Sequence, residues 1–169
     1  MNSSTLLIGL ILALIFIVPV MFLVRASSNA KKKYLKDLFN LAKNNNCSIS
    51  EHDHWNNTVI GIDKDHRNLF YINKTTNNES TVTIDLSEVK QCQVVNKSKN
   101  TGKKANYTPV TERLGLIFNY LGKDKPDTWL DFYNSDFDSS VPDREFKLVE
   151  KWSDIVNNVT AGLIPGPKK

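Results

Sequence analysis

The feature that most constrains the fold is a series of short runs, between residues 58 and 134, in which apolar and polar side chains alternate. A period of two is typical of a β-strand with one buried face. The clearest case is residues 81–86, where Val82, Ile84 and Leu86 alternate with threonine and aspartate. Turn-forming residues separate most of the runs, so most connections are short. The pattern predicts seven strands: TVIGID, NLFYIN, STVTIDL, EVKQCQVV, NYTPV, RLGLIFNYL and TWLDFYN.

Seven strands with short connections predict an antiparallel sheet system that closes or folds upon itself. The first two runs flank KDHR, which indicates a hairpin, and the proline in NYTPV is typical of an edge strand. RLGLIFNYL is apolar on both faces, as a buried strand should be. Three lone aspartates on the strands, Asp63, Asp85 and Asp131, are interpreted as register or edge features.

The chain is predicted to end in a helix over residues 142–160, followed by a flexible tail at 162–169. Ser140 precedes Asp143 by three residues, as in a capping box, and Pro142 lies in the first turn. One apolar stripe along this helix would cover the sheets, and we expect Trp152 in its middle to be buried. The stripe consists of Phe146, Val149, Trp152, Ile155, Val156 and Val159.

The N-terminus carries an uncharged apolar run of nineteen residues, Leu6–Val24. As a helix it would span roughly 28 Å, close to the hydrocarbon thickness of a bilayer. The apolar core of a cleaved signal is shorter, about 7–15 residues, and usually follows a basic segment that is missing here. We therefore expect an anchor over residues 1–28 with a membrane span at 6–24. The small residue Ala26 leaves cleavage and export as the alternative.

Basic residues follow this run and none precedes it, which predicts the orientation of the chain. The expected location is the plasma (inner) membrane, crossed once, with the N-terminus outside and the C-terminal domain in the cytoplasm. Residues 29–46 then form a juxtamembrane amphipathic helix or linker, with Leu35, Leu38, Phe39 and Ala42 on one face. That helix either packs on its own domain or lies in the membrane interface.

Residues Trp55–Val95 (WNNTVIGIDKDHRNLFYINKTTNNESTVTIDLSEVKQCQVV) resemble the first half of small bacterial pleckstrin-homology-like domains, in which a strand pair ending in D…LFYI leads into IDLSEV. With the final helix, the resemblance covers residues 50–160. It implies an α+β, mainly β fold over 47–161: a small antiparallel β-barrel or sandwich of about seven strands, capped by the C-terminal helix. A single N-terminal transmembrane helix before such a domain is similar to uncharacterised bacterial membrane-anchored proteins. The resemblance implies binding to lipids or peptides, or scaffolding, and brings no catalytic residues.

The expected function is a membrane-tethered, non-catalytic interaction or scaffolding module that presents its domain to a protein partner at the cytoplasmic face. A strand edge or a groove beside the final helix would bind this partner. The alternative is recognition of anionic lipid by the lysine-rich loop 97–104, with further lysines at the headgroups. The candidate lipid-binding residues are Lys31, Lys32, Lys33, Lys97, Lys99, Lys103 and Lys104.

The formal charge of +4 is concentrated in residues 25–43, which hold six basic residues against one acid. A nucleic-acid-binding domain would spread its basic residues over the folded part, so no nucleic-acid partner is expected. Two cysteines, Cys47 and Cys92, are too few for a secreted disulfide scaffold. Cys92 alternates with Val94 and is expected to be buried, and a 47–92 bridge would form only after export.

The segment CSISEHDHWNN is the one polar cluster with metal-ligating residue types. His52 and His54 would face one side of a strand, where they would share a metal with Cys47 or His66. The paired spacings typical of zinc sites are missing, so we expect a solvated segment and no metal. Phosphate-loop, nucleophile-elbow and HExxH motifs are missing too, so no catalytic residue and no cofactor are expected.

Overall fold

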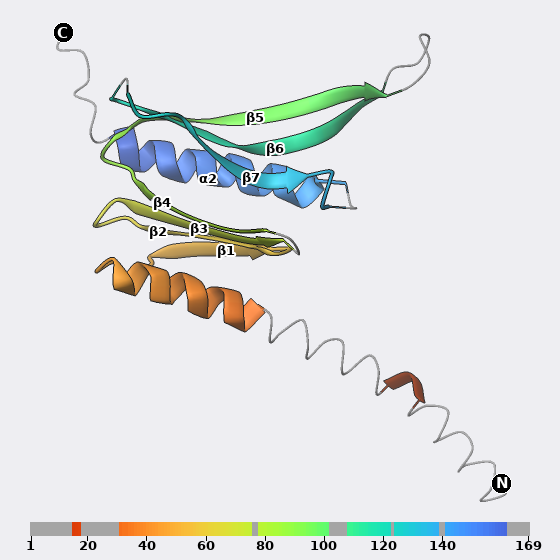
Figure 1. Ribbon diagram of the computed structural model, residues 1–169, viewed down its shortest axis with the longest axis horizontal. Coiled ribbons are helices and arrows are strands. Elements are labelled where there is room, and N and C mark those ends of the chain that lie inside the picture. Colours follow the sequence, from red (N-terminus) through yellow and green to blue (C-terminus); the bar gives the residue numbers. More distant parts are fainter. Residues whose placement is uncertain are drawn as a thin grey trace, which may run out of the picture.

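In the described residues, seven strands divide into two antiparallel sheets (Figure 1). The predicted runs NYTPV and RLGLIFNYL form one continuous strand in the middle of a sheet, so the predicted edge strand is wrong. EHDHW, which was expected to be a solvated segment, forms a strand that the alternation did not predict. The computed structural model describes residues 15–17, 31–75, 78–101, 108–122, 124–138 and 141–161. The first sheet has the order β1–β2–β3–β4 and the second β5–β6–β7. The elements are β1 (Glu51–Trp55), β2 (Thr58–Asp63), β3 (Asn68–Thr75), β4 (Asn78–Asp85), β5 (Val89–Thr101), β6 (Thr108–Tyr120), β7 (Thr128–Asn134) and α2 (Asp143–Ala161).

The first sheet is buried on both faces at β2, because each face covers a different apolar cluster. Ile60 and Ile62 point into the main core, and Val59 points to the opposite side. The predicted hairpin between the first two runs is confirmed, with Asp63 opposite Asn68. In β4, Ile84 is buried in the main core, as its alternation predicts, and Leu86 after the strand is buried there too.

Residues 31–44 are helical and pack on the outer face of the first sheet. Leu38 and Ala42 are buried there against Val59, Phe70 and Ile72. Gly61 allows this approach, because a Cβ atom at that position would lie 2.9 Å from Cδ2 of Leu38. Leu35, Leu38 and Ala42 of the predicted face are covered by the domain itself, as in the first of the two expected arrangements, whereas Phe39 is 44% exposed.

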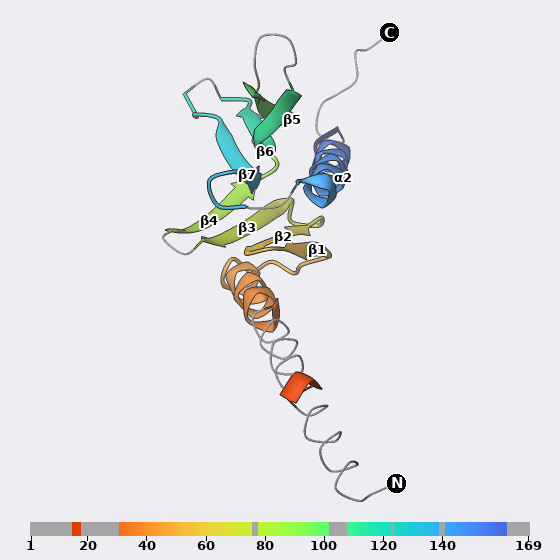
Figure 2. The same cartoon turned by 90° about the vertical axis from the view of Figure 1, so that its right-hand side faces the viewer.

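Helix α2 lies in the angle between the two inclined sheets (Figure 2) and contacts all three strands of the second one. Val149, Trp152 and Val156 are fully buried, so the predicted burial of Trp152 is confirmed. The Trp152 indole N–H donates to Asp53 Oδ2 of β1 at 2.9 Å. The acidic residues Asp143 and Glu145 in the first turn suit the positive end of the helix dipole.

The predicted barrel closure is wrong, since the two sheets stay separate. The turn at residues 86–88 connects β4 of the first sheet to β5 of the second. Side chains bridge the gap beside β7, where Trp55 Nε1 donates to the Phe132 carbonyl (2.9 Å) and Tyr71 Oη to the Asp131 carbonyl (2.6 Å). A register shift between β6 and β7 falls at the same place. The carbonyls of two neighbouring β7 residues thus accept hydrogen bonds from aromatic side chains of the first sheet.

The predicted transmembrane helix gains no support from the described residues. Within the part of the chain that the structure describes, no helix is long and apolar enough to cross a membrane. The predicted span at 6–24 lies outside the described residues except for 15–17. The predicted tail at 162–169 lies outside them as well.

Candidate binding cleft

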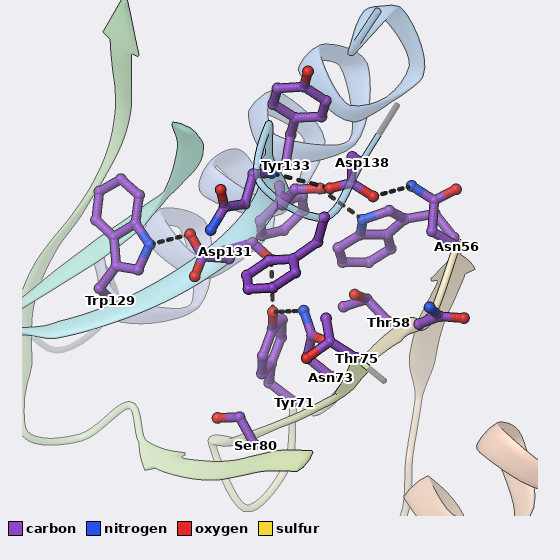
Figure 3. A pocket seen from close by; sticks show the side chains of 15 residues that line it. Asn56, Thr58, Tyr71, Asn73, Thr75, Ser80, Trp129, Asp131, Tyr133 and Asp138 are labelled. Atoms are coloured by element: carbon purple, nitrogen blue, oxygen red, sulfur yellow. Dashed lines mark hydrogen bonds between the residues drawn. The ribbon is translucent and has the colours of Figure 1, made fainter. Parts of the chain in front are cut away.

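A cleft of about 150 Å³ opens between the two sheets, beside β7 (Figure 3). Its lining comes from the β1–β2 turn, from β2 to β4, from β7 and from the loop after β7. Six aromatic side chains and four asparagines supply most of this lining. They are Trp55, Tyr71, Trp129, Phe132, Tyr133 and Phe137 with Asn56, Asn57, Asn73 and Asn134.

Tyr71 forms the base of the cleft and is only 2% exposed. Its hydroxyl donates to the Asp131 carbonyl at 2.6 Å and accepts a hydrogen bond from Asn73 Nδ2 at 3.1 Å. Burial raises the pKa of the Tyr71 phenol well above its ordinary value. The phenol is therefore neutral at physiological pH and remains a hydrogen-bond donor.

Trp129 forms one wall and is held in place from several sides. Its indole N–H donates to Asp131 Oδ1 at 2.6 Å, and Arg113 binds the two oxygens of the same carboxylate at 2.8 Å each. The Arg113 guanidinium also lies 5.3 Å from the Trp129 ring centroid. Gly115 leaves room for the ring, because a Cβ atom there would approach it to 2.7 Å. The indole is thus presented in one fixed orientation.

Asn56 organises the opposite side of the cleft (Figure 3), where the backbone turns with a φ of 42°. Its Nδ2 atom donates to Asp138 Oδ1 at 3.3 Å and to Glu145 Oε1 at 3.1 Å. The backbone N–H of Asn134 donates to the other oxygen of Asp138. These contacts join the β1–β2 turn, the loop after β7 and the first turn of α2.

The charges of the lining are acidic, because Asp131 and Asp138 are its only ionisable carboxylates and the described lining contains no lysine or arginine. Arg113 compensates Asp131 from outside the cleft. At the rim, Phe137 is 62% exposed, and nearby in the chain Val141 is 75% exposed. The surface therefore combines aromatic rings, amides and a modest negative charge, which does not suit an anion.

The described lysines of the predicted lipid-binding set fall into two separate groups. Lys31, Lys32 and Lys33 are exposed on the 31–44 helix, on the other side of the domain from β5 (Figure 1). Lys97 lies over the Trp129 ring at 5.3 Å, and Lys99 pairs with Glu112 at 3.5 Å. The remaining two, at 103 and 104, lie outside the described residues.

His52 and His54 do face one side of β1, but they contact aromatic rings of the 31–44 helix. The centroid distances are 5.4 Å from His52 to Phe39 and 5.5 Å from His54 to Tyr34. Desolvation lowers the pKa of His54, and the charges of Lys31 and Arg144 lower it further. The pair thus has a packing role, and Cys47 and His66 gather around Asp63 instead.

Cys47 and Cys92 are both free thiols and belong to different apolar clusters. Cys92 is buried, as its alternation with Val94 predicts. Burial raises the pKa of its thiol to about 12. Cys92 is therefore protonated at physiological pH and acts as a small apolar side chain of the core.

Sequence reasoning missed the residues of the cleft, Tyr71, Trp129 and Asn56 above all. A partial signal was present, because Trp129 and Asp131 alternate in TWLDFYN and so share one face of the strand. Searches for similar proteins give no match to any family model, curated protein or solved structure. The resemblance to pleckstrin-homology-like domains stays a prediction.

Proposed function

We propose that this chain is a non-catalytic interaction module whose inter-sheet cleft binds a short extended segment of a partner protein. The observation that carries the proposal is the fixed aromatic lining next to exposed apolar side chains. Aromatic residues are enriched at protein interfaces, and exposed apolar residues beside a cleft are typical of docking surfaces.

The size of the cleft supports a peptide over a cofactor or a metabolite. Pockets for whole small molecules usually have volumes of about 300–1,000 Å³. The cleft volume of about 150 Å³ suits one or two inserted side chains. The backbone of an extended segment would then run along the rim, where the side-chain oxygen of Asn56 can accept hydrogen bonds and the side-chain amide nitrogen of Asn134 can donate them.

Site-specific photo-crosslinking in cells that naturally contain the protein tests this proposal. A photoreactive amino acid in place of Phe137 should cross-link the full chain to a partner protein. The matched control is Leu121, which is 59% exposed and also apolar but does not line the cleft. Trp129→Ala should remove the cross-link from position 137. Equal cross-linking from both positions, or no effect of Trp129→Ala, would refute binding in the cleft.

Recognition of anionic lipid by the β5–β6 hairpin has less support. The ribbon does project beyond β7 (Figure 1), but Lys97 and Lys99 are engaged with Trp129 and Glu112. Flotation of the full chain with anionic and neutral liposomes tests this alternative. It would gain support if Lys97→Gln with Lys99→Gln weakened binding to the anionic liposomes only.

A further inference from the structure

Three different metal-ligating side chains meet away from the cleft, at the end of β2. The ligand atoms of Cys47, Asp63 and His66 all lie within 4.8 Å of one another. We propose that this cluster binds one divalent transition-metal ion of the zinc type, with water as the fourth ligand. Thiolate, imidazole and carboxylate are the three usual protein ligands of zinc.

Two parts of the chain converge to form the cluster, the segment after the 31–44 helix and the β2–β3 hairpin. Cys47 follows the 31–44 helix, and its backbone N–H donates to the Ala42 carbonyl at 2.9 Å. Asp63 is the last residue of β2, and His66 lies in the turn between β2 and β3. The helix that packs on the first sheet therefore also delivers the thiol to the turn.

Backbone groups already hold the Asp63 carboxylate, which is only 2% exposed. Oδ1 accepts hydrogen bonds from the N–H groups of Asp65 and His66, both at 2.9 Å. Oδ2 accepts one from Ser48 N–H at 2.6 Å. Such donors behind a ligating carboxylate fix its orientation toward a metal.

The backbone donors explain Asp63 as part of a turn, but they do not account for the thiol and the imidazole beside it. His66 Nδ1 lies 2.7 Å from Asp63 Oδ2, and Asn68 Nδ2 lies 3.5 Å from Cys47 Sγ. The Asn68 amide would continue to donate to a metal-bound thiolate. The soft thiolate and the imidazole favour zinc, because calcium and magnesium prefer oxygen ligands.

Metal binding requires a small rearrangement. Around a tetrahedral ion with bonds of about 2.0–2.3 Å, the ligand atoms lie about 3.3–3.8 Å apart. The His66 ring must therefore move away from Asp63 Oδ2, and its side chain is 61% exposed and free to do so. The ion replaces this hydrogen bond and the one from the Cys47 thiol to the Asn45 carbonyl, and it leaves the three backbone donors to Asp63 in place.

Titration of the metal-free full chain with Co²⁺ tests the site, because a thiolate ligand gives cobalt a characteristic charge-transfer absorption. We expect this band to saturate at one equivalent and to disappear when Zn²⁺ is added. Cys47→Ser should abolish the band, and His66→Gln should weaken Co²⁺ affinity by about tenfold or more. Cys92→Ala and His52→Gln are the matched controls and should bind Co²⁺ as the wild type does.

Thermal melting of each variant shows that it is folded before it is titrated. The absence of a thiolate band in the folded wild type, or its survival in Cys47→Ser, would overturn the proposal. An unchanged affinity in His66→Gln would overturn this set of ligands. The readout does not depend on the cleft or on a partner protein.

Discussion

Replacing Tyr71 by Phe tests whether side chains, in place of a strand ladder, hold the two sheets together. The substitution removes one oxygen atom and leaves the ring, which packs in the main core. Two groups lose a partner, the Asp131 carbonyl and Asn73 Nδ2. An unsatisfied buried polar group costs about 1–3 kcal/mol. Because Asn73 is only partly buried, most of the loss should come from the carbonyl.

The free energy of unfolding should therefore fall by about 1–3 kcal/mol in Tyr71→Phe, with an unchanged denaturant m-value. Urea denaturation followed by tryptophan fluorescence measures both quantities. The matched control is Tyr133→Phe, because within the described residues the Tyr133 hydroxyl has no hydrogen-bond partner and points away from the cleft (Figure 3). The control should change stability by less than about 0.5 kcal/mol. Equal stability losses in the two variants would refute the bridging role of Tyr71.

The same residue predicts the alkaline behaviour of the protein. The pKa of Tyr71 is raised in the folded state above its ordinary value of 10.0. Above pH 10 the unfolded chain therefore binds fewer protons than the folded chain, and stability falls as the pH rises. Tyr71→Phe should lose less stability than the wild type above pH 10. A parallel decline in both proteins would contradict the assignment.

Three further predictions concern the packing and the location of the chain. Trp152→Ala should lower the free energy of unfolding by about 3–5 kcal/mol, and a loss below 1 kcal/mol in urea denaturation would contradict its burial. Gly61→Ala should lower the free energy of unfolding by about 1–3 kcal/mol, because the new methyl group meets Leu38. It should also increase amide hydrogen exchange in residues 31–44, and unchanged exchange would argue against this contact. If the protein is anchored in the inner membrane, as its sequence predicts, the native protein should sediment with this membrane after an alkaline wash. Recovery in the soluble fraction would contradict the predicted location.

The elements of the fold were predictable because their signals are local. Alternation marked β2 to β5 and β7, but it divided the single strand β6 into two runs and missed β1, whose EHDHW sequence was expected to be a solvated segment. The apolar stripe marked α2, and these patterns placed Trp152 and Cys92 in the core. The register or edge role of Asp63 and Asp85 stays a prediction; each is the last residue of its strand and accepts a hydrogen bond from the turn that follows. Asp131 has another role, because it pairs with Arg113 and Trp129 beneath the cleft.

The cleft was not predictable because it depends on how two sheets meet. Trp55 and Phe132 are far apart in sequence, and no periodicity indicates that the indole of one reaches the carbonyl of the other. The register shift between β6 and β7 also changes which carbonyls face the first sheet. The cluster around Asp63 is similar, since it requires the 31–44 helix to dock before Cys47 reaches the turn.

The two aromatic bridges to β7 also determine how far the cleft can widen. Separating β7 from Trp55 and Tyr71 would break two hydrogen bonds, which contribute about 0.5–1.5 kcal/mol net each. It would also expose Trp55, which is 1% exposed and stacks on Phe132 with the ring centroids 4.6 Å apart. If a continuous strand ladder joined the two sheets, separating them would break several hydrogen bonds at once. The joint between the sheets therefore resists opening mainly through packed aromatic rings, and a partner segment should enter the cleft as it stands, without separating the sheets.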